Sequence, residues 1–197
     1  PAAKNEFSGN FSYVDNFEVD NNKAGLKELN PRWMFLRDFT DCYKVENGKL
    51  KFNLLPGNIY KREPMSAIWA RQQHGTFSAE TEINFTPRND KEIAGLALLQ
   101  KEDHNFVLGK TMKNGKLMIT LTRAEKNNVT IASAPIKGGK LKLKVEGHDR
   151  YYDFYYAEEG GSWQLLAKGV DASNLSTQKS GGFIGACIGL YASSNKE

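Results

Sequence analysis

The amino-acid sequence predicts an all-β protein built from two antiparallel sheets packed face to face. Runs of strand length recur along the chain, and turn dipeptides such as Asn-Gly and Gly-Gly separate many of them. No segment of ten residues has the spacing of an amphipathic helix. A series of short strands without helices is typical of a β-sandwich, because each sheet must bury its apolar face against a second layer.

Length and composition indicate one domain. The chain has 197 residues, of which 40% are hydrophobic and 11% aromatic, and this is enough for a single core. Residues 1–12 are polar and rich in Gly, Ser and Asn, so we expect a linker there and a single β-sandwich domain over residues 13–197. The Pro-Ala-Ala start without an initiator Met suggests a mature form or a fragment of a longer protein.

Charge and cysteine content narrow the function classes. The formal charge of +4 is spread along the chain, whereas a nucleic-acid binder usually gathers its basic residues on one element, so no nucleic-acid partner is expected. No run of about 18 apolar residues is present, so no membrane partner is expected either. Two cysteines are too few for a disulfide framework, and Cys187, inside an apolar run, is interpreted as a small buried hydrophobe.

The expected elements follow in chain order. The first part predicts a short strand at 14–17, a loop or helical turn at 24–31, an aromatic-rich strand at 32–39 and a hairpin about Asn47-Gly48. The second part predicts strands at 93–100, 106–110, 116–122, 129–134, 140–145, 151–156 and 163–167, a helical turn at 170–175 and a buried glycine-rich strand at 181–192. The lysines at 140, 142 and 144 alternate with apolar residues, which favours a solvated sheet face over an anion site.

Residues 67–87 are predicted to form the clearest β-hairpin of the chain, with its turn at Gly75. Its second arm alternates apolar and polar residues, as expected of a strand with one face on a core. Such a hairpin could bring Arg71 alongside Glu80 and Glu82, where an ion pair is expected. The long loop just before it, residues 55–66, contains two prolines, a glycine and a tyrosine, and long loops often carry function.

No motif for catalysis or metal binding is present. The three histidines lie on different elements, and neither a paired-histidine zinc motif nor a nucleophile elbow occurs. Glu80 and Glu82 share a face of one strand, but such pairs are common on exposed sheets, and glycoside hydrolysis needs two carboxylates at a set separation. We therefore assign no catalytic residue and no metal ligand.

The hairpin does carry residues suited to sugar binding. Planar polar groups beside an aromatic ring match the hydroxyls and the C–H faces of a sugar. In the opposing interpretation Trp69 belongs to the core, and Arg71 forms a structural ion pair with the two glutamates. The residues alone favour neither the sugar-binding interpretation nor the structural one.

Several strings together resemble one known module, in the same order and with sensible spacing. They are WMFLR at 33–37, IWARQQHGTFSAETEINFTP at 68–87, IAGLALLQ at 93–100, YYDFYYAEEGGSWQLL at 151–166, VDASNLS at 170–176 and GGFIGACIGLYA at 181–192. Over about residues 14–192 the chain is similar to the C-terminal domain of glycoside hydrolase family 43 enzymes, the β-xylosidases and α-L-arabinofuranosidases.

The resemblance implies a concanavalin A-like jelly-roll sandwich that packs on a catalytic five-bladed β-propeller, a domain missing from this chain. In that family a loop of the sandwich helps to close the propeller's pocket. Residues 55–66 are our candidate for this loop, with Tyr60, Pro64 and Met65 at its tip. The residues expected to face sugar or the pocket are Tyr60, Met65, Trp69, Arg71, Gln73, His74 and Glu80.

The sequence thus predicts an accessory, non-catalytic domain of a xylan- or arabinan-degrading glycosidase, with xylo- or arabino-oligosaccharide as ligand. The alternative is an independent carbohydrate-binding module of the same fold. No cofactor is required, although Asp15, Asp20 or Asp171 could supply oxygen ligands to a structural calcium ion. The sequence does not determine the cellular compartment, and a secreted or periplasmic location is slightly preferred over a cytoplasmic one.

Overall fold

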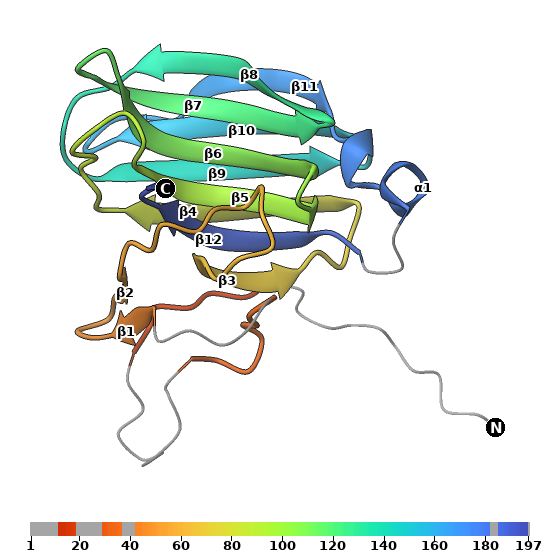
Figure 1. Cartoon of the computed structure of the whole chain (residues 1–197), viewed down its shortest axis with the longest axis horizontal. Helices are drawn as coiled ribbons and strands as arrows, with labels where there is room; N and C mark the ends of the chain where they lie inside the picture. The colour runs from red at the N-terminus through yellow and green to blue at the C-terminus, as the bar shows by residue number, and fades with distance from the viewer. Residues whose placement is uncertain (1–11, 19–28, 37–41, 182–184, 197) are drawn as a thin grey trace.

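The structure is a computed structural model that describes residues 12–18, 29–36, 42–181 and 185–196 (Figure 1). These residues form two sheets packed face to face, which confirms the predicted class. The larger sheet has six antiparallel strands, in the order β3 (Ser66–Arg71), β12 (Cys187–Ser193), β5 (Ile93–Lys101), β6 (His104–Lys113), β7 (Lys116–Glu125) and β8 (Asn127–Pro135). The smaller has four, in the order β11 (Gln164–Asp171), β10 (Tyr151–Glu158), β9 (Leu141–His148) and β4 (Thr76–Ile83).

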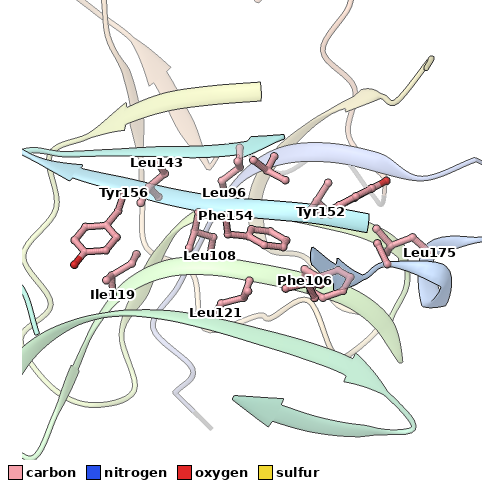
Figure 2. Packing of buried hydrophobic residues seen from close by; sticks show 14 of the residues in the cluster. Leu96, Phe106, Leu108, Ile119, Leu121, Leu143, Tyr152, Phe154, Tyr156 and Leu175 are labelled. Atoms are coloured by element: carbon pink, nitrogen blue, oxygen red, sulfur yellow. The ribbon is translucent and has the colours of Figure 1, made fainter. Parts of the chain in front are cut away.

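The main core lies between the two sheets (Figure 2). Phe106 of the larger sheet and Phe154 of the smaller meet at its centre, with ring centroids 5.7 Å apart, and both are fully buried. The strand β9 shows how the sequence sets this arrangement: Leu141, Leu143 and Val145 are buried, while the residues between them lie on the outer face. Period-two alternation therefore fixes which face of the smaller sheet enters the core.

Two Asn-Gly turns close hairpins as predicted. Asn47 and Gly48 have φ values of 53° and 66° and join β1 (Tyr43–Val45) to β2 (Leu50–Phe52). Asn114 and Gly115, with φ values of 50° and 75°, join β6 to β7. Positive φ at both central residues matches the right-handed twist of the paired strands, and Asn and Gly accept it at low cost.

The hairpin predicted for residues 67–87 is wrong. The strand β3 pairs with β12 in the larger sheet, and β4 pairs with β9 in the smaller one, so the connection at residues 72–75 crosses from one sheet to the other. The first four residues of β3 are all buried, which shows that this strand is covered on both faces. Alternation within β4 was interpreted correctly, but alternation does not identify a strand's partner.

The N-terminal part is less regular than predicted. Residues 14–17 form no strand, and within 32–36 only Met34 pairs, through an isolated bridge to Trp69 with N–O distances of 2.8 and 2.9 Å. The expected linker up to residue 11, most of the turn at 24–31 and residues 37–39 lie outside the described residues.

The C-terminal part follows the prediction in order but not in its bounds, since the strand expected at 181–192 begins at Cys187. A 3₁₀ turn, Ser173–Leu175, and a short helix α1, Thr177–Ser180, precede β12, which lies between β3 and β5. Cys187 is a free, buried thiol, as interpreted from the sequence, and Cys42 is also free and buried. Among the described residues, no helix has the length and hydrophobicity needed to cross a bilayer.

Candidate functional site

The loop from Leu54 to Met65 lies across the outer face of the larger sheet (Figure 1). Its first part is fixed at both sides: the Leu55 amide donates to Ser66 Oγ and the Ser194 amide to the Leu55 carbonyl, each at 2.9 Å. Further along, the Ile59 amide donates to the hydroxyl of Tyr191 at 3.3 Å. The loop is therefore held on the sheet and does not extend freely from it.

A second apolar cluster lies beneath this loop. The loop contributes Ile59 and Met65, which are 0% and 6% exposed, and β3 contributes Trp69, which is 1% exposed. The other buried members are Ala67, Ala97, Leu99, Val107, Cys187 and Tyr191. Tyr191 lies among these apolar residues, and this burial raises the pKa of its phenol.

Two of the residues expected to face sugar are thus core residues. Trp69 lies beneath the loop, and Met65 is the last residue of the loop. Both side chains are almost fully buried, so they leave almost no surface for a ligand. Trp69 follows the opposing interpretation from the sequence, in which it belongs to the core. Burying an indole and a thioether here stabilises the loop's position, because large apolar side chains contribute about 1.5–3 kcal/mol each when buried.

Tyr60 is half-buried at the middle of the loop. Its hydroxyl lies 3.4 Å from Thr122 Oγ1 on β7, and burial is the main cause that raises its pKa. The next two residues, Lys61 and Arg62, are exposed, and Arg62 Nε lies 3.3 Å from Glu102 Oε1 in the β5–β6 turn. The exposed part of the loop is therefore a basic corner next to a tyrosine.

At the base of the loop the surface is hollowed by a depression of about 570 Å³. Its walls come from the loop, from the middle of the β4–β5 connection and from the residues after β12. They are Leu54, Pro56, Asn58, Lys61, Glu63, Arg88, Ser194, Asn195 and Lys196. Amide, ammonium and carboxylate groups dominate this lining, and such groups exchange hydrogen bonds with hydroxyls.

A buried carboxylate orients one wall of this hollow. Glu92 is 1% exposed and accepts from Arg88 Nε at 3.0 Å and from Arg88 Nη2 at 2.7 Å, while the Arg88 backbone amide donates to its second oxygen at 2.8 Å. The Arg88 hydrogen bonds lower the pKa of Glu92 below its usual value. Both guanidinium donors bind the same carboxylate oxygen, and these charge-assisted hydrogen bonds restrict the orientation of the Arg88 head group.

Arg71, Gln73 and His74 lie at the opposite end of the larger sheet from the hollow. All three are exposed, at the end of β3 and in its connection to β4. The antiparallel register places this connection and the β5–β6 turn at the same end of the sandwich. Because Arg62 reaches that turn through Glu102, the loop extends from the hollow to the end that carries these three residues.

Glu80 is separated from the other predicted site residues. It lies on the outer face of the smaller sheet, exposed and opposite Lys144 in the register of β4 and β9. Glu82 pairs with Lys140, at 3.7 Å, and not with Arg71. The expected ion pair between Arg71 and the two glutamates is wrong because their strands belong to different sheets.

The proposed calcium ligands do not converge in the structure. Asp15 accepts from Trp33 Nε1 at 2.6 Å, and Asp171 accepts from Arg150 Nε at 3.1 Å and from the Ser173 amide at 2.9 Å. The Arg150 and Ser173 hydrogen bonds lower the pKa of Asp171 far below its usual range. Asp20 lies outside the described residues, and within those that are described no group of three potential ligands could hold a metal ion.

Sequence reasoning missed most of the hollow. Arg88, Asn195 and Lys196 come from two segments that no motif marks, and only the fold brings them to the loop. The available signal was local: Arg88 and Glu92 are spaced by four residues within a turn-rich connection. The loop itself was identified correctly from its length and its prolines.

Fold and surface together define an antiparallel β-sandwich domain with a polar hollow beside an ordered loop. Residues 24–197 match the family described as the beta-xylosidase C-terminal concanavalin A-like domain. The chain belongs to this family of C-terminal domains, which confirms the resemblance inferred from its motifs.

Related proteins agree with this assignment. The chain is 32% identical over 158 residues to a xylosidase/arabinosidase of Butyrivibrio fibrisolvens, a match that covers 79% of this chain and 30% of that protein. It is similar to the Bacteroides ovatus Xyloglucan PUL GH43B structure, with a TM-score of 0.83, 22% identity and coverage of 92% of this chain and 35% of that one. A GH43_12 structure retrieved from capybara gut metagenome gives a TM-score of 0.67 and 28% identity, and the match covers 73% of this chain and 28% of that one. The chain therefore spans about a third of the length of each of these three proteins.

Proposed function

We propose that this domain is the accessory, non-catalytic part of a xylan- or arabinan-degrading glycosidase, docks on a catalytic β-propeller and shapes its substrate pocket. The observation that carries the proposal is the family match over residues 24–197. It is combined with the finding that this chain covers only about a third of the length of these relatives. The remaining two-thirds of such a protein leaves room for a catalytic domain.

The outer side of the larger sheet is the face that we assign to docking. It carries the fixed loop, the basic corner of Lys61 and Arg62 and the polar hollow. A loop that is already ordered loses little conformational entropy when a second domain covers it, so it can shape a pocket at low cost. Hydrogen-bonding groups in the hollow suit the hydroxyls of a xylo- or arabino-oligosaccharide.

The docking role is tested in a chimera of the Butyrivibrio fibrisolvens enzyme in which this chain replaces the matching C-terminal region. We expect the chimera to hydrolyse an aryl β-xyloside or aryl arabinofuranoside, and the enzyme lacking that region to be impaired. Substituting Lys61→Ala and Arg62→Ala together should lower kcat/KM about fivefold, since charge pairs at the edge of an interface each contribute about 1 kcal/mol or less. Lys168→Ala, an exposed lysine on β11, is the matched control.

The non-catalytic assignment is tested on the 197-residue chain alone. We expect no turnover of the aryl xyloside. Turnover that Glu80→Gln or Glu82→Gln abolishes would make this chain an enzyme and overturn the proposal.

A further inference from the structure

The outer face of the smaller sheet carries a cluster of aromatic and polar side chains that are partly or fully exposed. The register of the four strands aligns Glu80 on β4, Lys144 on β9, Tyr155 on β10 and Leu165 on β11 in one row across the sheet. Neighbouring strands lie about 4.8 Å apart, so this row extends about 14 Å. In Figure 1 the smaller sheet lies behind the larger one, and its outer face therefore points away from the loop at residues 54–65.

Lys144 holds two aromatic rings of this face together. Its Nζ lies 4.5 Å from the ring centroid of Tyr155 and 4.8 Å from that of Trp163, and 2.9 Å from Glu146 Oε1. Both ring distances are within the range of cation–π attraction. The Lys144 side chain is only 16% exposed, whereas Trp163 is 37% and Leu165 50% exposed. The cation is thus covered while apolar surface beside it stays open to solvent.

This face carries charges of both signs. Lys142 and Lys144 lie on β9, and Lys140 lies just before it. The carboxylates are Glu80 and Glu82 on β4, Glu146 on β9 and Asp153 on β10. Two of the lysines pair with glutamates, Lys140 with Glu82 at 3.7 Å and Lys144 with Glu146 at 2.9 Å. A face on which lysines and carboxylates alternate does not favour a polyanion, and it suits a neutral ligand rich in hydroxyls.

We propose that Lys144, Tyr155, Trp163 and Leu165 form a binding platform for a neutral β-1,4-linked xylan chain, on the side of the domain opposite the docking face. The choice of xylan rests on the proposed function. Aromatic rings match the C–H faces of the sugars, and the neighbouring glutamates and lysines accept from and donate to their hydroxyls. Because Lys144 already fixes the two rings, little side-chain entropy is lost on binding. The platform holds polymer near the enzyme and takes no part in bond cleavage.

Xylohexaose is the probe, titrated into the 197-residue chain by calorimetry and followed by NMR at the Trp163 indole. We expect saturable binding with a Kd of about 1 mM or below, in the range of a single weak site. Trp163→Ala and Tyr155→Ala should each weaken binding about tenfold, which corresponds to about 1.4 kcal/mol. Tyr13→Ala is the matched control, because Tyr13 is also an exposed tyrosine, 37% exposed, with an arginine 4.6 Å from its ring centroid.

The platform is overturned if xylohexaose does not bind at about 10 mM, or if Trp163→Ala binds it as tightly as the unchanged chain. Equal melting temperatures of the variants exclude unfolding as the cause of a loss. In the chimera, Trp163→Ala should slow the hydrolysis of soluble arabinoxylan, whereas the control Tyr13→Ala should leave it unchanged. A chimera that is inactive while the chain still binds xylohexaose contradicts the docking role alone, and the reverse result contradicts the platform alone.

Discussion

The α-carbon of Gly189 packs against the indole of Trp69, its partner in the register of β12 and β3. A β-carbon at position 189 would lie 2.4 Å from Trp69 Cε3 and 2.6 Å from the Ile68 carbonyl oxygen. Gly189 therefore serves close packing, whereas an added β-carbon at Gly181 or Gly185 of the same glycine-rich segment would meet nothing within 4 Å. Trp69 in turn supports the loop, so this contact links the last strand to the docking face.

Gly189→Ala should destabilise the domain by about 1–3 kcal/mol, because the added methyl group overpacks a buried site whose neighbours include backbone. Urea denaturation measures the change. Gly185→Ala is the control: it precedes the same strand, and an added β-carbon there meets nothing within 4 Å. Equal stability of the two variants would contradict the close contact.

Ser66→Ala should loosen the loop. Ser66 is fully buried, and its hydroxyl accepts from the Leu55 amide at 2.9 Å and donates to the Asn53 carbonyl. Removing it leaves both backbone groups without this partner, which costs about 1–3 kcal/mol. We expect faster hydrogen exchange and proteolysis within residues 54–65, whereas Ser133→Ala, on an exposed position of β8, should change neither. Unchanged exchange in the loop would show that other contacts suffice.

Glu92 should make stability depend on acid pH. Its pKa in the folded domain lies below the ordinary 4.5, mainly through the hydrogen bonds of Arg88. The unfolded chain therefore binds more protons as the pH falls through about 4.5, and the free energy of unfolding decreases there, while the full contribution is present at neutral pH. Chemical denaturation between pH 7 and about pH 3 measures the slope. Glu92→Gln should lower stability at pH 7 and flatten the decline, and Glu80→Gln should do neither. An equally steep decline in Glu92→Gln would assign the slope to other carboxylates.

Local signals predicted those features that depend on neighbouring residues in the chain. Asn47-Gly48 and Asn114-Gly115 could be identified as turns because their chemistry permits positive φ at both positions. The alternation in β9 predicted its buried and solvated faces for the same reason. Even the long loop at 55–66 was visible, since prolines and a glycine interrupt any strand there.

Local sequence signals could not predict which strands pair with each other. The alternation of β4 is compatible with a hairpin to β3 and with the observed pairing to β9, and only the packing of the two sheets selects the second. That selection separates Glu80 from Arg71. The hollow has the same origin, because its lining comes from segments separated by more than a hundred residues.

By itself, the sequence determined the all-β class, the family and the strands whose faces are buried, because alternation, turn dipeptides and collinear motifs are properties of the chain. Only the tertiary structure decided which side chains share a surface. Pairing between distant strands depends on how apolar faces fit together across the core, and no pattern within one strand records that fit. For this reason the residues predicted to face sugar from a single hairpin lie apart. Trp69 is buried beneath the loop, Arg71 ends its strand in the larger sheet, and Glu80 lies on the outer face of the smaller sheet.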